Sequence, residues 1–146
     1  MLSPSFSLAE FTRSQTAARK GIDNTPNAAA IANMKSLCIH VLQPLRDYLG
    51  KPIRINSGFR CALLNTAIGG SGTSQHMEGK AGDIDVPGVE PFEVAKIIID
   101  LDLPFDQLIH EFREWVHVSY DPSRDRRAVL TAQLIDGHTQ YVHGLV

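Results

Sequence analysis

The spacing of apolar residues predicts a long amphipathic helix in the first third of the chain. From Asn27 to about Tyr48 the apolar positions recur at steps of three and four residues, which marks one buried helix face. We expect Pro44 to kink this helix and Gly50 to end it. Shorter helical patterns cover residues 8–21, after a Ser7 N-cap and up to Gly21, and residues 61–68 and 91–103.

Other segments alternate apolar and polar residues, as half-buried strands do. These are residues 53–56 and 82–86, and a predicted hairpin of residues 105–112 and 115–121 that turns near Arg113 and Glu114. Residues 128–144 are expected to form a final strand or helix followed by a tail. The resulting prediction is an α+β fold, with a small antiparallel sheet flanked by helices. A chain of 146 residues fits a single domain spanning residues 1–146.

Composition and charge argue against some classes of binding partner. With 43% hydrophobic and 21% charged residues, the chain is expected to form a packed core. The net charge of -2, without any run of like charges, argues against nucleic acid as a partner. No apolar stretch approaches the roughly 18 residues of a membrane span, so we expect no membrane insertion. The N-terminus lacks a basic start followed by an apolar run, which predicts synthesis in the cytoplasm without a signal peptide.

A basic stretch, two cysteines and a glycine-rich loop need separate interpretation. The basic stretch Arg124–Arg127 is interpreted as a solvated turn without function, and Cys38 and Cys61 as buried thiols. Residues 69–82 form a long polar loop rich in glycine. A loop of this length inside a compact domain is usually functional or disordered, and the presence of His76 and Glu78 in it favours a function.

Candidate metal ligands lie in this loop and in the strands that follow it. A catalytic zinc needs three ligands among His, Cys and carboxylate, and leaves a fourth position for water. His76 in the loop, Asp83 in the next strand and His117 in a distant strand fit this requirement. Side-chain alternation places Asp83 and Asp85 on one strand face, so spacing alone does not decide which carboxylate meets the metal.

Three motifs resemble a known family. Residues 74–83, SQHMEGKAGD, match Ser-x-His-x-x-Gly-x-Ala-x-Asp at every fixed position; SGFR at 57–60 and WVHVS at 115–119 resemble its other elements. This pattern is similar to that of the zinc D-Ala-D-Ala carboxypeptidase family, which includes phage endolysins, and the resemblance covers roughly residues 5–145.

The resemblance implies a site as well as a fold. The fold would be D-Ala-D-Ala carboxypeptidase or hedgehog-like, with Zn²⁺ in a cleft over the sheet. The implied zinc ligands are His76, Asp83 and His117. The implied substrate contacts are Arg60 and Ser74, and Arg60 would also take part in catalysis by helping to hold the oxyanion. Asp85 would support the ligands or the structure. For the general base, Glu114 is favoured because it stands three residues before His117, and Glu111, which shares strand parity with His117, is the alternative.

The implied function is hydrolysis of peptide bonds in bacterial peptidoglycan. We expect a monomeric phage or prophage endolysin that reaches the cell wall after release or as part of a phage. The first alternative is a bacterial D-Ala-D-Ala carboxypeptidase or dipeptidase, and the second is a non-catalytic wall-binding or phage structural module.

Overall fold

One six-stranded mixed sheet organises the chain, of which the computed structural model describes residues 1–146. The strand order is β1-β2-β4-β3-β5-β6. The strands are β1 (Arg54–Ser57), β2 (Ala81–Asp85), β3 (Gln107–Glu111), β4 (Trp115–Ser119), β5 (Ala128–Ile135) and β6 (His138–His143). The α+β class is confirmed.

The prediction of a purely antiparallel sheet is wrong at one pair of strands, since β5 runs parallel to β3. After β4, residues 120–127 cross past the start of β3. As a result, β5 pairs with the edge of β3 opposite to β4 and runs in the same direction as β3. The segment predicted as a strand or helix with a tail is instead the antiparallel hairpin of β5 and β6.

The helices follow the apolar pattern with two adjustments. They are α1 (Leu8–Thr12), α2 (Gln15–Lys20), α3 (Ala28–Leu37), the π-helical η1 (Cys38–Leu42), α4 (Gln43–Leu49), α5 (Ala62–Ala67), the 3₁₀ helix η2 (Gln75–Glu78) and α6 (Pro91–Asp100). Ser7 caps α1 as predicted, but Arg13 is extended and Ser14 caps a second helix, so the single predicted helix is two.

The long helix is interrupted just before Pro44. Proline has no N–H for the α-helical ladder, and the residue before it, Gln43, donates its N–H to the Cys38 carbonyl five positions back. The expected kink therefore takes the form of a π-helical turn. Gly50, in the left-handed conformation at φ 62°, ends the helix as predicted.

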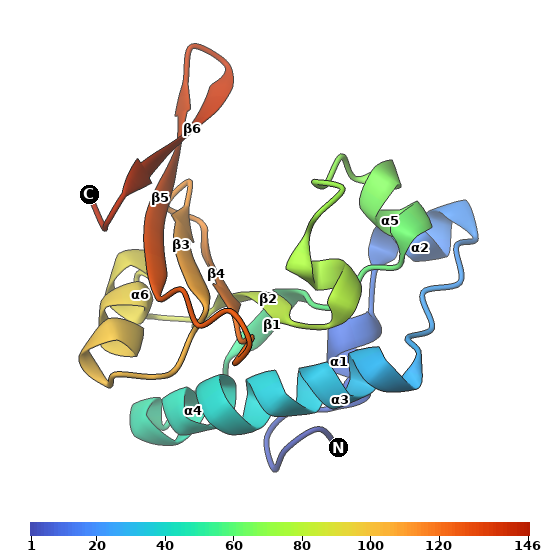
Figure 1. Cartoon of the computed structure of the whole chain (residues 1–146), viewed down its shortest axis with the longest axis horizontal. Helices are drawn as coiled ribbons and strands as arrows, with labels where there is room; N and C mark the ends of the chain where they lie inside the picture. The colour runs from blue at the N-terminus through green and yellow to red at the C-terminus, as the bar shows by residue number, and fades with distance from the viewer.

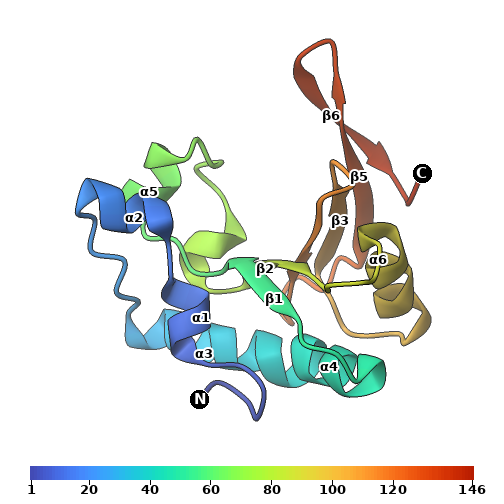
Figure 2. The same cartoon turned by 180° about the vertical axis from the view of Figure 1, so that it is seen from behind.

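The core lies between the helices and one face of the sheet. Figures 1 and 2 show α3 and α4 running along one side of the molecule, α6 beside β3, and the β5–β6 hairpin projecting away from the rest. The core side chains include Met34, Leu37, Ile84, Ile98, Val116 and Val118, all fully buried. None of the helices combines the length and apolar character needed to cross a bilayer.

A buried carboxylate at the start of β3 ties three segments together. The Asp106 side chain is fully buried, and it accepts hydrogen bonds from the Arg126 backbone and guanidinium and from Gln75 Nε2 at 2.9 Å. Burial alone would raise the pKa of Asp106, but the hydrogen bonds from Arg126 and Gln75 lower it to about 2. This carboxylate fixes the loop before β5 and the start of η2 against β3.

Asp106→Asn is expected to lower the free energy of unfolding at pH 7 by roughly 2 to 3 kcal/mol, because it leaves the Arg126 charge without its partner. The folded pKa of about 2 lies below the ordinary 3.8, so this stabilisation is present above about pH 4 and is lost as the pH falls through 2. Urea unfolding from pH 7 to pH 2 measures it. The control is Asp102→Asn, which breaks an exposed pair with Arg127 and should cost under about 1 kcal/mol. Equal losses in the two variants would contradict the prediction.

Candidate metal centre

The motif SQHMEGKAGD places His76 through a short turn with defined ends. The Ser74 hydroxyl accepts a hydrogen bond from the His76 backbone N–H at 3.2 Å and so caps η2. Gly79 ends η2 at φ 75°, where a Cβ atom would lie 2.4 Å from the Ala30 carbonyl oxygen. The serine and glycine of the motif therefore hold the His76 turn against α3.

Strand pairing brings the other two candidate ligands together. Asp83 of β2 lies opposite His117 of β4 in antiparallel register. The Asp83 Oδ1 atom is 3.0 Å from His117 Nδ1 and 3.2 Å from His76 Nε2. As predicted, Val116 and Val118 face the core while His117 faces the opposite side of the sheet.

The donor set fits a zinc ion. The three ligand atoms all lie within 4.8 Å of one another. In a tetrahedral site with metal distances of about 2.0 to 2.1 Å, neighbouring ligand atoms are about 3.3 Å apart. The spacings of 3.0 and 3.2 Å around Asp83 Oδ1 are close to this value. His76 Nδ1 lies 2.7 Å from the Gly58 carbonyl, a contact that leaves Nε2 free to bind a metal.

Electrostatics favour the protonation states that metal binding requires. Burial lowers the pKa of His76, which favours the neutral imidazole. Burial alone would raise the pKa of Asp83, but the neighbouring His76 and His117 outweigh it and hold that pKa below its usual range. A neutral imidazole and an ionised carboxylate are both ready to coordinate a cation.

Asp83 and Asp85, which spacing alone left equivalent, have different partners. Asp85 forms an ion pair with Arg54 across the β1–β2 pairing, whereas Asp83 contacts the two histidines. The structure thus puts Asp83 in the cluster and gives Asp85 a partner in β1.

A cavity of about 740 Å³ surrounds the cluster. Its walls include all three candidate ligands and also Arg60, Ser74, Glu111, Trp115, Arg124, Arg126 and Tyr141. The structure therefore brings together six of the eight residues considered in the sequence as ligands, substrate contacts or bases, and leaves out Asp85 and Glu114.

Arg60 lies beside the histidine turn. Its backbone N–H donates to the His76 carbonyl at 3.1 Å, and its Nη2 atom donates to Ser74 Oγ at 3.4 Å. The buried Nε atom has no hydrogen-bond partner, and no carboxylate lies within ion-pair distance of the guanidinium. Arg60 thus lines the cavity with a charge that no carboxylate pairs, while Ser74 also has a structural part in capping η2.

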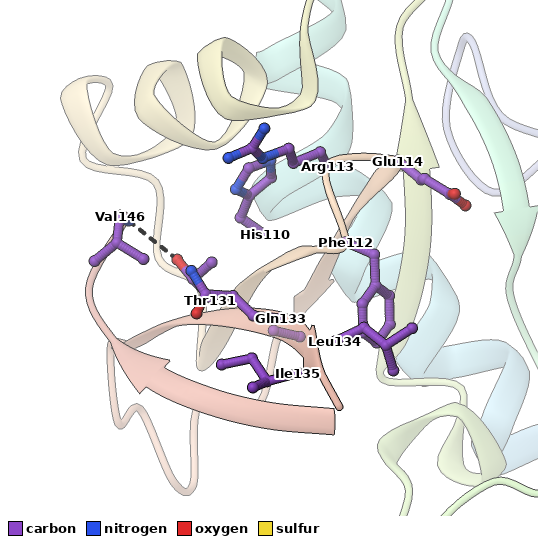
Figure 3. Close-up of a pocket in the computed structure, with 10 residues that line it drawn as sticks. His110, Phe112, Arg113, Glu114, Thr131, Gln133, Leu134, Ile135 and Val146 are labelled. Carbon is purple, nitrogen blue, oxygen red and sulfur yellow. Dashed lines mark hydrogen bonds between the residues drawn. The ribbon is translucent and has the colours of Figure 1, made fainter. Parts of the chain in front are cut away.

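The two candidate bases lie on different sides of the β3–β4 turn. Glu111, the last residue of β3, lines the cavity of the cluster, and burial raises the pKa of its carboxyl, with the Asp83 charge adding to the rise. Glu114 lines a second cavity of about 650 Å³ with His110 and Arg113. Figure 3 shows the Glu114 carboxylate directed away from those two side chains.

The turn geometry explains this difference. Phe112 and Arg113 have φ values of 55° and 60°, and the chain reverses before β4 begins at Trp115. Glu111 pairs with Trp115 and shares the face of Ile109, which lies opposite His117. Glu114 stands outside this strand pairing, so a spacing of three residues from His117 does not bring it to the cluster.

Sequence reasoning missed three residues of the cavity wall. Arg124 and Arg126 come from the stretch interpreted as a solvated turn, and Tyr141 comes from the segment left as a strand or helix. Residues 124–127 are exposed, as predicted, but Arg126 also binds the buried Asp106. Only the crossing from β4 to β5 brings these residues to the site, and no local pattern encodes that crossing.

Comparison with known proteins agrees with this geometry. The peptidase M15 family model matches residues 4–119. A zinc D-Ala-D-Ala carboxypeptidase of Streptomyces albus G is 46% identical over 44 residues, which is 30% of this chain and 17% of that protein. The match thus spans less than a fifth of this relative's length. All three candidate ligands lie inside residues 4–119, whereas Arg124, Arg126 and Tyr141 lie beyond them.

His117→Ala is expected to weaken zinc affinity more than about 100-fold, because loss of even an outer-shell partner of a zinc ligand costs 10- to 100-fold. Metal analysis after dialysis and competition with a chromogenic chelator measure the change. His143→Ala removes an exposed histidine of β6 and should leave zinc affinity unchanged. Unaltered zinc affinity in His117→Ala would rule out the cluster as the metal site.

Proposed function

We propose that this chain, which belongs to the peptidase M15 family, hydrolyses peptide bonds of bacterial peptidoglycan with Zn²⁺ as its cofactor. The observation that carries the proposal is the contact of Asp83 Oδ1 with both His76 and His117 inside a cavity that also holds Glu111 and Arg60. This set contains a metal-binding cluster, a proton acceptor and a hydrogen-bond donor for the substrate.

His76, Asp83 and His117 would hold the zinc ion, which when bound polarises a carbonyl and lowers the pKa of water to about 7. Glu111 is the residue we propose as general base. It would accept the proton of the attacking water at its carboxylate and pass that proton to the leaving amine. The raised pKa of Glu111 suits this exchange, because a more basic carboxylate takes up a proton more readily.

Arg60 is proposed to orient the substrate. Its guanidinium carries donors in a fixed planar fork, and no carboxylate of the protein lies within ion-pair distance of it. A carboxylate or carbonyl oxygen of the peptide would accept charge-assisted hydrogen bonds from it. Such contacts would hold the scissile bond between the metal cluster and Glu111.

The finer role we propose is that of a monomeric phage or prophage endolysin acting on the cell wall. The support is the resemblance of the SQHMEGKAGD motif to endolysins as well as carboxypeptidases. A D-Ala-D-Ala carboxypeptidase is the second candidate, and the name of the Streptomyces relative favours it. A non-catalytic module is disfavoured, because the ligand cluster and Glu111 are all present in one cavity.

Glu111→Gln is expected to lower kcat by about 100- to 10,000-fold, the range for loss of a general base, while zinc content stays unchanged. Hydrolysis of purified peptidoglycan by zinc-loaded protein measures this. Glu114→Gln is the matched variant and should retain kcat within about twofold, since a surface turn residue outside the cavity lacks a path to the reacting atoms.

The two variants also decide between the candidate bases. A large loss in Glu114→Gln with little change in Glu111→Gln would reverse the assignment. Mass spectrometry of the products separates the two finer roles, because an endopeptidase releases internal fragments and a carboxypeptidase releases only the terminal D-Ala. Zinc-loaded protein that hydrolyses neither peptidoglycan nor its stem peptides would overturn the proposed function.

A further inference from the structure

The loop between β4 and β5 places one exposed arginine, Arg124, in the wall of the cavity that contains the cluster. Its first anchor is Asp121, a buried carboxylate that accepts hydrogen bonds from the Ser123 N–H at 3.1 Å, the Ser123 hydroxyl at 2.6 Å and Lys80 Nζ at 3.1 Å. The Asp121 carbonyl also accepts the Arg124 N–H at 3.0 Å. The backbone of Arg124 is therefore fixed directly to a buried group.

The second anchor lies on the other side of Arg124. Arg126 is bound to the buried Asp106 and forms this anchor. The neighbouring Arg127 forms an exposed pair with Asp102 outside the cavity. Between the anchors, Asp125 adopts a φ of 41°, a conformation that a non-glycine residue rarely takes without support. The loop is thus held on both sides of Arg124 in a conformation that costs free energy.

Arg124 differs from the other two arginines of the loop in having no carboxylate within ion-pair distance. Its side chain lines the cavity that contains the metal cluster and Arg60, which also has no ion-pair partner. A cation bound by the cluster would add further positive charge, against which the cavity offers only Asp83 and Glu111 as acids. Two unpaired guanidinium groups beside a cation attract an anionic ligand.

We propose that Arg124 binds a carboxylate of the peptide substrate, so that the site selects peptides with a free carboxylate near the scissile bond. This inference rests on the proposed function and names the substrate class for that site. The carboxylate is either the C-terminal one of the peptide or that of an internal acidic residue. Arg124 is a specificity-determining residue and takes no part in the proton transfer.

Steady-state hydrolysis of synthetic stem peptides by zinc-loaded protein tests the proposal. The parent peptide is L-Ala-D-Glu-L-Lys-D-Ala-D-Ala, compared with one form amidated at the C-terminus and one amidated at the glutamate. Arg124→Gln should raise KM for the parent about tenfold, the order expected for loss of one charge-assisted hydrogen bond, with kcat changed less than about twofold. Arg124→Lys should recover part of the KM, because it restores the charge without the planar fork.

The amidated peptides identify the carboxylate. Amidation of the group that Arg124 binds should raise KM in the wild-type protein and remove the effect of Arg124→Gln. Arg127→Gln, in the same loop but paired outside the cavity, should leave KM for all three peptides unchanged. Equal KM values for all three peptides in the wild type, or the same KM increase in Arg124→Gln for each of them, would overturn the proposal while leaving the peptidase function intact. Absence of hydrolysis of every peptide and of peptidoglycan would instead overturn the proposed function on which it rests.

Discussion

A single carboxylate oxygen, Asp83 Oδ1, contacts both histidines of the cluster, and the rest of the site is arranged around this contact. It depends on the register that sets Asp83 opposite His117 between β2 and β4. A slip of one residue would turn the Asp83 side chain toward the core and Ile84 toward the cavity. The buried Ile84, Val116 and Val118 oppose such a slip, so core packing and ligand geometry fix the same register.

Most helices could be predicted from local spacing, and the candidate metal ligands from the resemblance of their motifs to a known family. Ser74 and Gly79 define the ends of one turn, and Val116 and Val118 flank His117 in a regular alternation. The placement of Glu111 in the cavity in preference to Glu114 depends on positive φ values at Phe112 and Arg113, which neither residue type favours. The parallel pairing of β5 with β3 depends on a crossing loop whose anchors, Asp106 and Asp121, act through contacts distant in sequence.

The cavity draws on two parts of the chain that differ in their relation to known proteins. The ligand cluster, Arg60 and Glu111 lie within the stretch matched by the family model. The wall residues Arg124 and Tyr141 come from the loop and hairpin after it. Asp106 joins the two parts, because its carboxylate binds both Gln75, next to a candidate ligand, and Arg126 of the crossing loop. A change in the loop is therefore coupled to the position of the histidine turn through one buried group.

The π-helical turn at Cys38–Leu42 has a consequence for how this chain tolerates changes in length. Removing one residue from a regular α-helix rotates everything after it by about 100° relative to what came before. A π-helical turn already accommodates one residue more than the α-helical repeat. Deletion of one residue here would convert the turn to a regular helix and keep the apolar faces of α3 and α4 in phase, whereas the same deletion within α3 would rotate Leu45 of α4 out of the core. The helix beneath the sheet thus has one position at which a change of one residue keeps the same faces of α3 and α4 toward the core.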